Sequence, residues 1–258
     1  MQRRQIFCIA LAVATAVVVP IDAQITEVRV LSSGATAAAY LQLIPRLEAN
    51  KTLKAVTLAI ATGVGNANIV TRIRGGEPFD VVFISAATMD DLIKTGHIAA
   101  SSRVDIARSS IGLAVRAGRP RPDISSVDAL KNAFLQAKSI AISAQISGVY
   151  LTNELFPQLG IADRVMPKVK RIENEPVGEV VARGEAELGI QQISELRAVK
   201  GVDLVGPFPT EVQRVSVFSI GISTKAPNPK GATALVDLVT SSAGAAAMRE
   251  SGLEPIAR

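Results

Sequence analysis

Three turns in the first third of the chain carry small polar residues directly after apolar runs. They read Ser32-Ser33-Gly34, Thr62-Gly63 with nearby Asn66, and Ser85-Ala86. Small side chains let backbone N–H groups approach a ligand closely, and a helix that starts at such a turn directs its positive end at the same point. The turns therefore favour binding of a small anion, although the second one also fits an ordinary strand-to-helix connection.

The residues around these turns predict alternating strands and helices. Strand-like runs occupy residues 27–31, 56–60 and 80–84, and a helix-like stretch follows each of them. Such a series is typical of an α/β fold with mostly parallel sheets and helices on both faces. Since ligands bind at the carboxyl ends of the strands in these sheets, the three turns are expected to lie together.

The middle of the chain repeats this alternation and predicts a second lobe. Its expected strands are residues 111–115, 139–143, 168–172 and 188–191, and its expected helices are residues 126–137, a stretch after Gly148 through Leu155, and residues 177–183. The strand at 139–143 leads into a fourth small-residue turn, Ser147-Gly148. A strand at 215–222 and two Ala-rich helices within 230–251 complete the pattern.

Metal, triad and nucleotide chemistry are not supported by the composition. The chain has one histidine, His97, and one cysteine, Cys8, whereas zinc sites cluster such ligands and a Ser-His-Asp triad would have to use that one histidine. The segment 62–68 lacks both the third glycine of a dinucleotide loop and the Lys-Ser/Thr of a P-loop. The glutamates between 173 and 187 are interpreted as a solvated face. We therefore expect no metal, no cofactor and no catalytic residue.

The first 23 residues have the pattern of an export signal. Arg3 and Arg4 precede a charge-free apolar run at 6–19, and Asp22-Ala23 offers a cleavage position; an uncleaved anchor shares this pattern. Cys8 lies inside the run, so the mature chain has no disulfide. A net charge of +5 without a basic cluster argues against nucleic-acid binding and suits small anions.

Several of these segments resemble the periplasmic molybdate-binding proteins. Residues 75–86 are similar to that family's run of small residues, Pro-x-Asp, an apolar strand and Ser-Ala, and weaker similarity extends over residues 28–255. The resemblance implies a two-lobed type II periplasmic-binding fold joined by two crossing strands. One lobe comprises residues 24–108 with 219–258, and the other comprises residues 109–218.

The resemblance also implies which residues hold the ligand. In that family, serine hydroxyls and backbone N–H groups bind an oxyanion. By position, the corresponding groups are Ser33, Thr62 or Asn66, and the backbone amides of Ser85, Ser147 and Val177. Gln191-Gln192 stands where the family has a tyrosine, and an amide suits a small carboxylate at least as well as a tetrahedral oxyanion. Arg72, Arg108 and Arg171 are possible cationic contacts.

The function implied is capture of a small anion in the cleft of a periplasmic, monomeric binding protein that delivers it to the membrane subunits of an ABC importer. Closure of the two lobes would signal occupancy to that partner. The alternative is a secreted isomerase of the aconitate isomerase type, to which the same resemblance extends. That reaction moves a proton on a tricarboxylate and needs a base, and no residue stands out as one.

Overall fold

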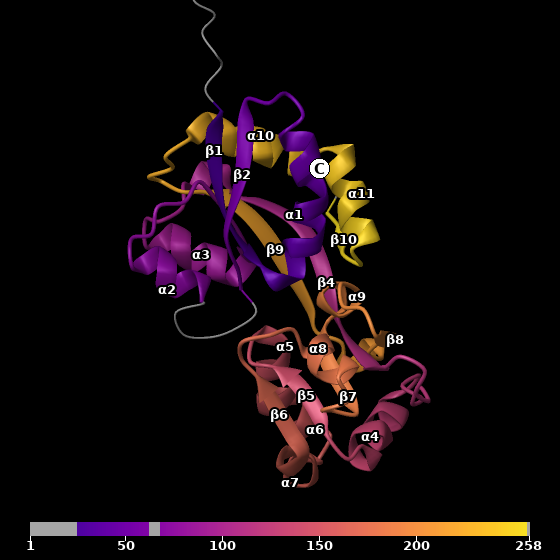
Figure 1. Cartoon of the computed structure of the whole chain (residues 1–258). Helices are drawn as coiled ribbons and strands as arrows, with labels where there is room; N and C mark the ends of the chain where they lie inside the picture. Colours follow the sequence, from indigo (N-terminus) through magenta and orange to yellow (C-terminus); the bar gives the residue numbers. More distant parts are fainter. Residues whose placement is uncertain (1–24, 62–67, 257–258) are drawn as a thin grey trace, which may run out of the picture.

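The structure, a computed structural model, describes residues 25–61 and 68–256. The predicted export signal and the predicted site residues Thr62, Gly63 and Asn66 lie outside these described residues. The described chain forms two lobes of strands and helices, with the long strands β4 (Val104–Arg116) and β9 (Val215–Ile222) running between them (Figure 1). None of the helices in the described ranges is long and apolar enough to cross a membrane.

Figure 1 shows that the first lobe combines elements from the early and the late parts of the described chain. Its other elements are β1 (Thr26–Ser33), α1 (Gly34–Leu47), β2 (Leu53–Ala61), α2 (Ile69–Arg74), β3 (Val81–Ser85), α3 (Ala86–Lys94), η2 (Ala100–Ser102), α10 (Pro229–Val239), α11 (Ser242–Glu250) and β10 (Glu254–Pro255).

The second lobe is formed by the middle of the chain. Its elements are α4 (Val127–Gln136), β5 (Ile140–Ser143), α5 (Ile146–Tyr150), the π-helical turn η3 (Leu151–Leu155), α6 (Phe156–Gln158), α7 (Ala162–Val165), η4 (Met166–Lys168), β6 (Val169–Ile172), α8 (Val177–Ala182), β7 (Leu188–Gln192), α9 (Ile193–Arg197), β8 (Val202–Pro207) and η5 (Thr210–Val212).

The strands pair in the order β2-β1-β3-β9-β4-β7-β5-β6. The parallel pairs lie within the lobes: β1 pairs with β2 and β3, and β5 pairs with β6 and β7. Every antiparallel pair between named strands involves β4 or β9. The two parallel groups are therefore joined by a pair of antiparallel strands, and the sheet as a whole is mixed.

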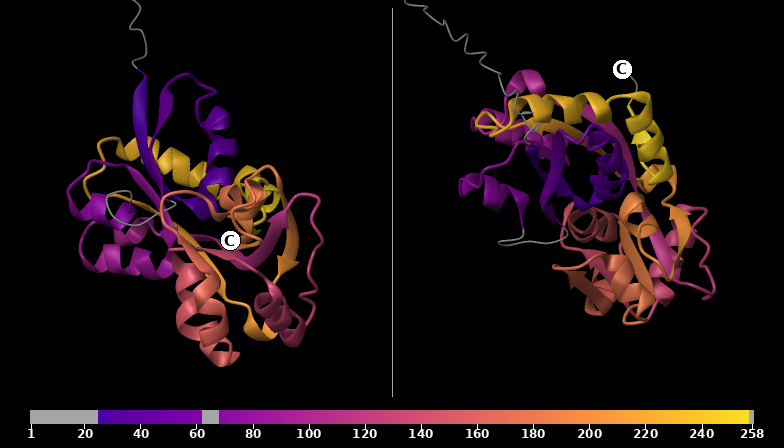
Figure 2. Two further views of the ribbon diagram at one scale, coloured as in Figure 1. Left: turned by 60° about the horizontal axis from the view of Figure 1, so that its bottom comes forward. Right: turned by 45° about the horizontal axis from the view of Figure 1, so that its top comes forward.

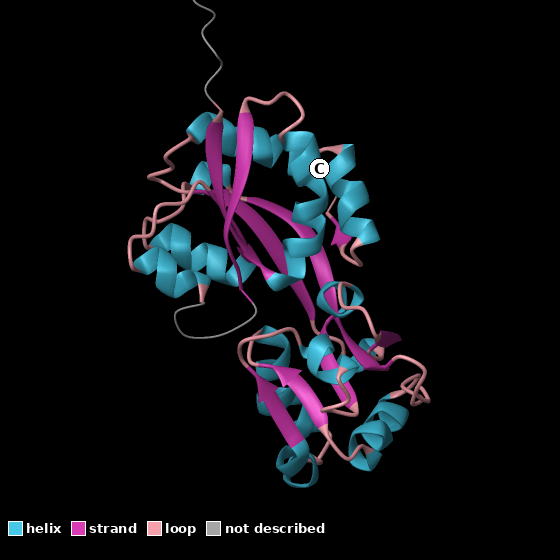
Figure 3. Ribbon diagram, in the orientation of Figure 1, coloured by secondary structure: helices cyan, strands magenta, loops and turns pink. Residues whose placement is uncertain are grey.

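Helices cover both faces of the strands in each lobe, as the views in Figures 2 and 3 show. In the first lobe, Tyr40 and Leu235 belong to one buried cluster and Met89 to another. In the second lobe, Phe134 belongs to one cluster and Val181 to another. Burial of these apolar side chains fixes the helices against the strands, and so sets where each helix begins.

The predicted α/β class and the alternation of strands and helices are confirmed, and the structure adds several elements that were not expected. β4 extends N-terminally beyond the expected strand at 111–115, and β8 and α9 were not predicted at all. α9 has five residues with two apolar positions, Ile193 and Leu196, so it is too short for a helical period to be visible in the sequence. The exact residue limits of the two lobes stay a prediction.

Candidate functional site

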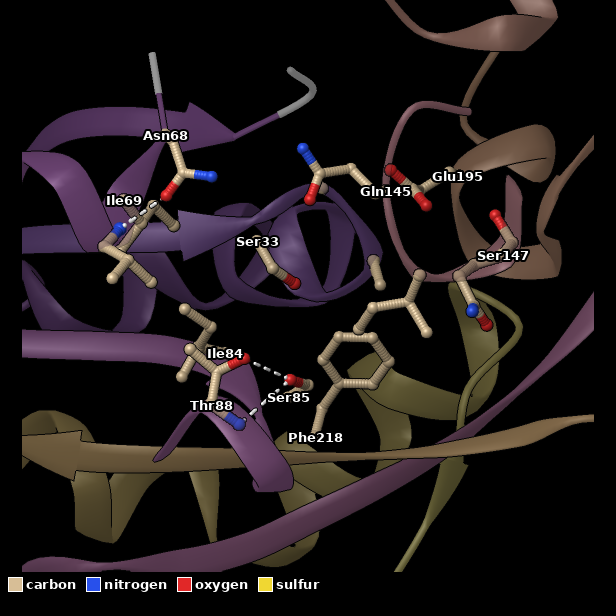
Figure 4. A pocket seen from close by; sticks show the side chains of 15 residues that line it. Ser33, Asn68, Ile69, Ile84, Ser85, Thr88, Gln145, Ser147, Glu195 and Phe218 are labelled. Atoms are coloured by element: carbon tan, nitrogen blue, oxygen red, sulfur yellow. Dashed lines mark hydrogen bonds between the residues drawn. The ribbon is translucent and has the colours of Figure 1, made fainter. Parts of the chain in front are cut away.

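A cavity of about 130 Å³ lies where the two lobes face each other. That volume is well below the roughly 300 Å³ at which sites for drug-sized ligands begin, so it suits a small metabolite. The described residues that line it are Ser33, Gly34, Ala35, Asn68, Ile69, Val70, Ile84, Ser85, Thr88, Gln145, Ile146, Ser147, Gln192, Glu195 and Phe218. Figure 4 shows Ser33, Asn68 and Ser85 on one side and Gln145, Ser147 and Glu195 on the other.

Among the described residues, five helices begin at this pocket. The residues that precede them, at the N-cap positions of α1, α2, α3, α5 and α9, are Ser33, Asn68, Ser85, Gln145 and Gln192. The first N–H groups of a helix have no partner within the helix and carry a partial positive charge. Their convergence gives the pocket an affinity for negative groups at several separate points.

On the wall from the first lobe, the polar side chains differ in the hydrogen bonds that they make within the protein. The Ser85 hydroxyl bonds to the Thr88 hydroxyl at 2.8 Å and accepts from the Thr88 backbone N–H at 3.4 Å. Asn68 accepts from the Val70 N–H at 2.9 Å. Ser33 makes no side-chain cap bond to an N–H of α1, and its hydroxyl lies 3.4 Å from the Thr36 hydroxyl, at the limit of a hydrogen bond. Its hydroxyl is therefore the one on this wall that is best placed to turn to a ligand.

On the wall from the second lobe, Gln192 is 3% exposed and lines the cavity. Its Nε2 group donates to the Ser216 hydroxyl at 3.4 Å, whereas its Oε1 atom has no hydrogen-bond partner among the described residues. Buried polar atoms are almost always paired in folded proteins. The unpaired Oε1 atom of Gln192, which borders the cavity, is therefore suited to accept a hydrogen bond from a bound molecule.

Glu195 is the one ionisable side chain among the described residues that line the pocket. It lies in the first turn of α9 and accepts a hydrogen bond from Gln191 Nε2 at 2.9 Å. Burial raises the pKa of the Glu195 carboxyl to about 8, although the bonds from the Gln191 amide and the Gln192 backbone lower it. A carboxyl of this kind exchanges a proton near neutral pH.

The structure brings together some of the predicted site residues and places others elsewhere. Ser33, Gly34, Ser85, Ser147 and Gln192 line the pocket. The remaining described residues predicted to contact the ligand directly are not among its lining residues, and they are Ser32, Ala86, Gly148, Val177 and Gln191.

These five residues have other roles that their contacts explain. Ser32 is fully buried and bonds to Thr36, and Ala86 is the first residue of α3. The Val177 N–H donates to Gln191 Oε1 at 2.9 Å, so it is used within the protein. At Gly148 a Cβ atom would lie 1.7 Å from the Ser143 carbonyl oxygen; this glycine lets α5 approach β5.

The three predicted cationic contacts do not line the pocket either. Arg72 forms an ion pair with Glu77 and donates to the Leu58 carbonyl at 3.0 Å. Arg171 donates to the Ala144 carbonyl at 3.3 Å, and Arg108 is exposed on β4. Among the described lining residues, the groups that could bind an anion are therefore N–H groups and hydroxyls and not cationic side chains.

Sequence reasoning missed Asn68, Gln145 and Glu195. The asparagine could have been found, because Asn is a favoured N-cap and Ile69-Val70 follow it directly. Glu195 gave no signal, since the helix that presents it was not predicted. In the described residues, no group of three or more His, Cys, Asp or Glu comes together in a way that could hold a metal ion.

Comparison with known proteins agrees with this geometry. The family model described as bacterial extracellular solute-binding protein matches residues 28–254. The chain belongs to the bacterial extracellular solute-binding proteins. Among solved structures, it resembles the periplasmic molybdate-binding protein of Azotobacter vinelandii, with a TM-score of 0.70 and 18% identity over 88% of this chain and 98% of that one.

Two further relatives extend the comparison. The sulfate-binding protein of Mycobacterium tuberculosis has a TM-score of 0.67 and 18% identity over 90% of this chain and 87% of that one. A protein of Pseudomonas sp. named aconitate isomerase is 41% identical over 234 residues, which cover 90% of this chain and 89% of that protein. The first likeness shows the type II fold, and the second places an enzyme by name within the same family.

Proposed function

We propose that this protein binds a small polycarboxylate between its lobes and isomerises it by moving a proton, as the name of its 41% identical relative suggests. The observation that carries the proposal is the pocket itself. Five helix starts face it from both lobes, and they offer separate points at which several carboxylate groups of one molecule can be held. A single tetrahedral oxyanion would use fewer of them.

The composition of the pocket also fits a reaction. General acid–base catalysis needs a group that can gain and lose a proton at the working pH, and the described lining includes one carboxyl with a pKa of about 8. The rest of the described lining consists of N–H groups, hydroxyls, amides and apolar side chains, which can hold a substrate without competing for its proton.

A time course with trans-aconitate tests the proposal. We expect ¹H NMR to show its conversion to cis-aconitate by the purified protein and no conversion by the heat-denatured protein. Thermal shift with aconitates, citrate, molybdate, tungstate and sulfate should give the largest rise in Tm with a tricarboxylate, because ligands that bind only the native state stabilise it. Absence of turnover with freshly folded protein contradicts the isomerase proposal.

A second candidate function is favoured by the family and by the structural neighbours that are named as binding proteins. Here the chain would be a monomeric periplasmic protein that delivers a small anion to the membrane subunits of an ABC importer. Tight binding of one anion without any conversion, together with stimulation of ATP hydrolysis by an importer in liposomes, would support this function over the first. Export and cleavage near Ala23 stay predictions.

A further inference from the structure

The Glu195 carboxyl is held from its own lobe and borders the pocket. Gln191 Nε2 donates to it at 2.9 Å, and it also accepts from the Gln192 backbone. We propose that Glu195 is the residue that takes and returns the proton in the isomerisation, and that Gln191 positions it for this task. The inference rests on the proposed function and adds to it the catalytic group and the residue that holds it.

The orientation of the Gln191 amide follows from its second partner. Gln191 Oε1 lies 2.9 Å from the backbone nitrogen of Val177, and Gln191 is 1% exposed. A backbone N–H can only donate, so the oxygen of the amide must face Val177. The NH₂ group must then face Glu195, where it donates to the carboxyl oxygen. The start of α8 thus fixes an amide that in turn fixes the carboxyl.

The proton transfer balances without any further reactant. The ionised carboxyl of Glu195 accepts a proton from a carbon next to a substrate carboxylate, so that a C–H bond breaks and an O–H bond forms. The electron pair moves into the neighbouring double bond and carboxylate groups. The protonated Glu195 then gives a proton back to a carbon of that conjugated system, which restores both the substrate's proton count and the carboxylate.

Glu195 also has a structural role, which the test must separate from catalysis. It is the third residue of α9 and reaches back to the N–H of Gln192 at the N-cap position, as in a capping box. Glu179 is the third residue of α8 and has the same place in its helix, but it is exposed and does not line the pocket. Glu179 therefore supplies a matched control.

Glu195→Gln keeps a residue that serves the capping box equally well, so the helix start is retained. We expect turnover of trans-aconitate to fall by about 10²–10⁴-fold. The thermal shift with tricarballylate, a tricarboxylate without a double bond, should persist. Glu179→Gln should leave both measurements unchanged. If E195Q turns over as fast as the native protein, the assignment is wrong; if the native protein itself is inactive, the proposed function has failed instead.

The pH dependence of tricarballylate binding gives a second test, which does not depend on measuring turnover. Ionised Glu195 repels a bound carboxylate and the neutral acid does not, so the Kd should rise as pH increases through about 8. The rise should be less than tenfold per pH unit above that value, because the ionised form must still bind the substrate in order to take its proton, and E195Q should not show it. A pH-independent Kd in the native protein would place the titrating carboxyl away from the ligand and overturn the assignment.

Gln191→Met removes the amide at similar volume and tests the positioning role. Because the bond from Gln191 lowers the pKa of Glu195, the rising limb of kcat/KM against pH should move to higher pH, and kcat/KM at pH 7 should fall by roughly tenfold. A purely structural role would lower Tm and leave the limb in place. A limb that does not move would overturn the positioning role of Gln191.

Discussion

Both walls of the pocket are built from the N-terminal ends of helices, and they differ in the side chains that they place beside these helix ends. Each wall presents helix starts, but the wall from the first lobe adds Ser33, Asn68 and Ser85 and no ionisable side chain among the described lining residues. The wall from the second lobe adds the amide of Gln192 and the carboxyl of Glu195. The comparison suggests that the first wall holds the ligand and that the second wall acts on it.

The largest effect on stability is expected from a substitution that displaces the pocket wall contributed by the second lobe. Gly148→Ala places a methyl group 1.7 Å from the Ser143 carbonyl oxygen, so α5 must move away from β5 together with Ser147. We expect the free energy of unfolding to fall by roughly 2–3 kcal/mol, measured by urea denaturation. Val149→Ala is the control on the same helix, since Val149 is 43% exposed. Equal stability of G148A and V149A would mean that α5 is not held by this close approach.

A smaller effect should appear in the dependence of stability on pH. The pKa of Glu195 is about 8 in the folded protein against an ordinary value of 4.5, so the folded chain binds the proton more strongly than the unfolded chain. Stability should therefore decrease as pH rises from about 4.5 to 8. We expect a loss of about 1–3 kcal/mol because solvent in the pocket reduces the full effect.

Calorimetry of the native protein and of E195Q at pH 5 and pH 8 measures this loss. The difference in Tm between the two pH values should be smaller in the variant. Each kcal/mol of pH-dependent stability that the variant lacks should reduce this difference by about 2–4 °C. Glu179→Gln should behave as the native protein does, because Glu179 is exposed. If E195Q keeps the full pH dependence, another group is responsible for it.

The smallest effects are expected from alanine substitutions of two serines on the wall from the first lobe, and the two substitutions should differ in what they change. Ser85 caps α3 through Thr88, so Ser85→Ala should cost about 1 kcal/mol of stability. Ser33 accepts no such bond from an N–H of α1, and its contact with the Thr36 hydroxyl is long at 3.4 Å, so Ser33→Ala should leave stability within about 0.5 kcal/mol. It should instead weaken tricarboxylate binding by about tenfold, since hydrogen bonds to charged groups are worth about 1.5–3 kcal/mol.

Thermal unfolding and isothermal titration measure the two variants. An S33A variant that binds as well as the native protein would remove Ser33 from the ligand contacts.

The parts of the molecule that follow from long patterns could be predicted from the sequence. The apolar run that became β3 and the turn at Ser85 are visible because a buried strand is a continuous apolar stretch with a polar residue at its end. The turn at Ser33 follows the same logic. Ser147 was found through the corresponding turn of the second lobe, and the chain brings all three to one pocket.

The parts that depend on short elements or on single contacts could not be predicted. Glu195 lies on a helix of five residues, and its character comes from burial, which the residue type alone does not reveal. Gln191 was expected to contact the ligand, yet it is not among the residues that line the pocket, and its amide bonds to the Val177 N–H and to Glu195. Such roles are set by partners distant in sequence, and no local pattern contains them.

The pairing of the strands has a consequence for how the protein can be tuned. Among the described strands, β4 and β9 run between the lobes, and Ser109 of β4 pairs with Ser216 of β9. The gap between the Ser33 wall and Glu195 is thus governed by the bending of two strands together with the packing of α9 on α1. A substitution in β4 or β9 can therefore change the distance between the Glu195 carboxyl and a bound molecule while every residue that contacts this molecule stays the same.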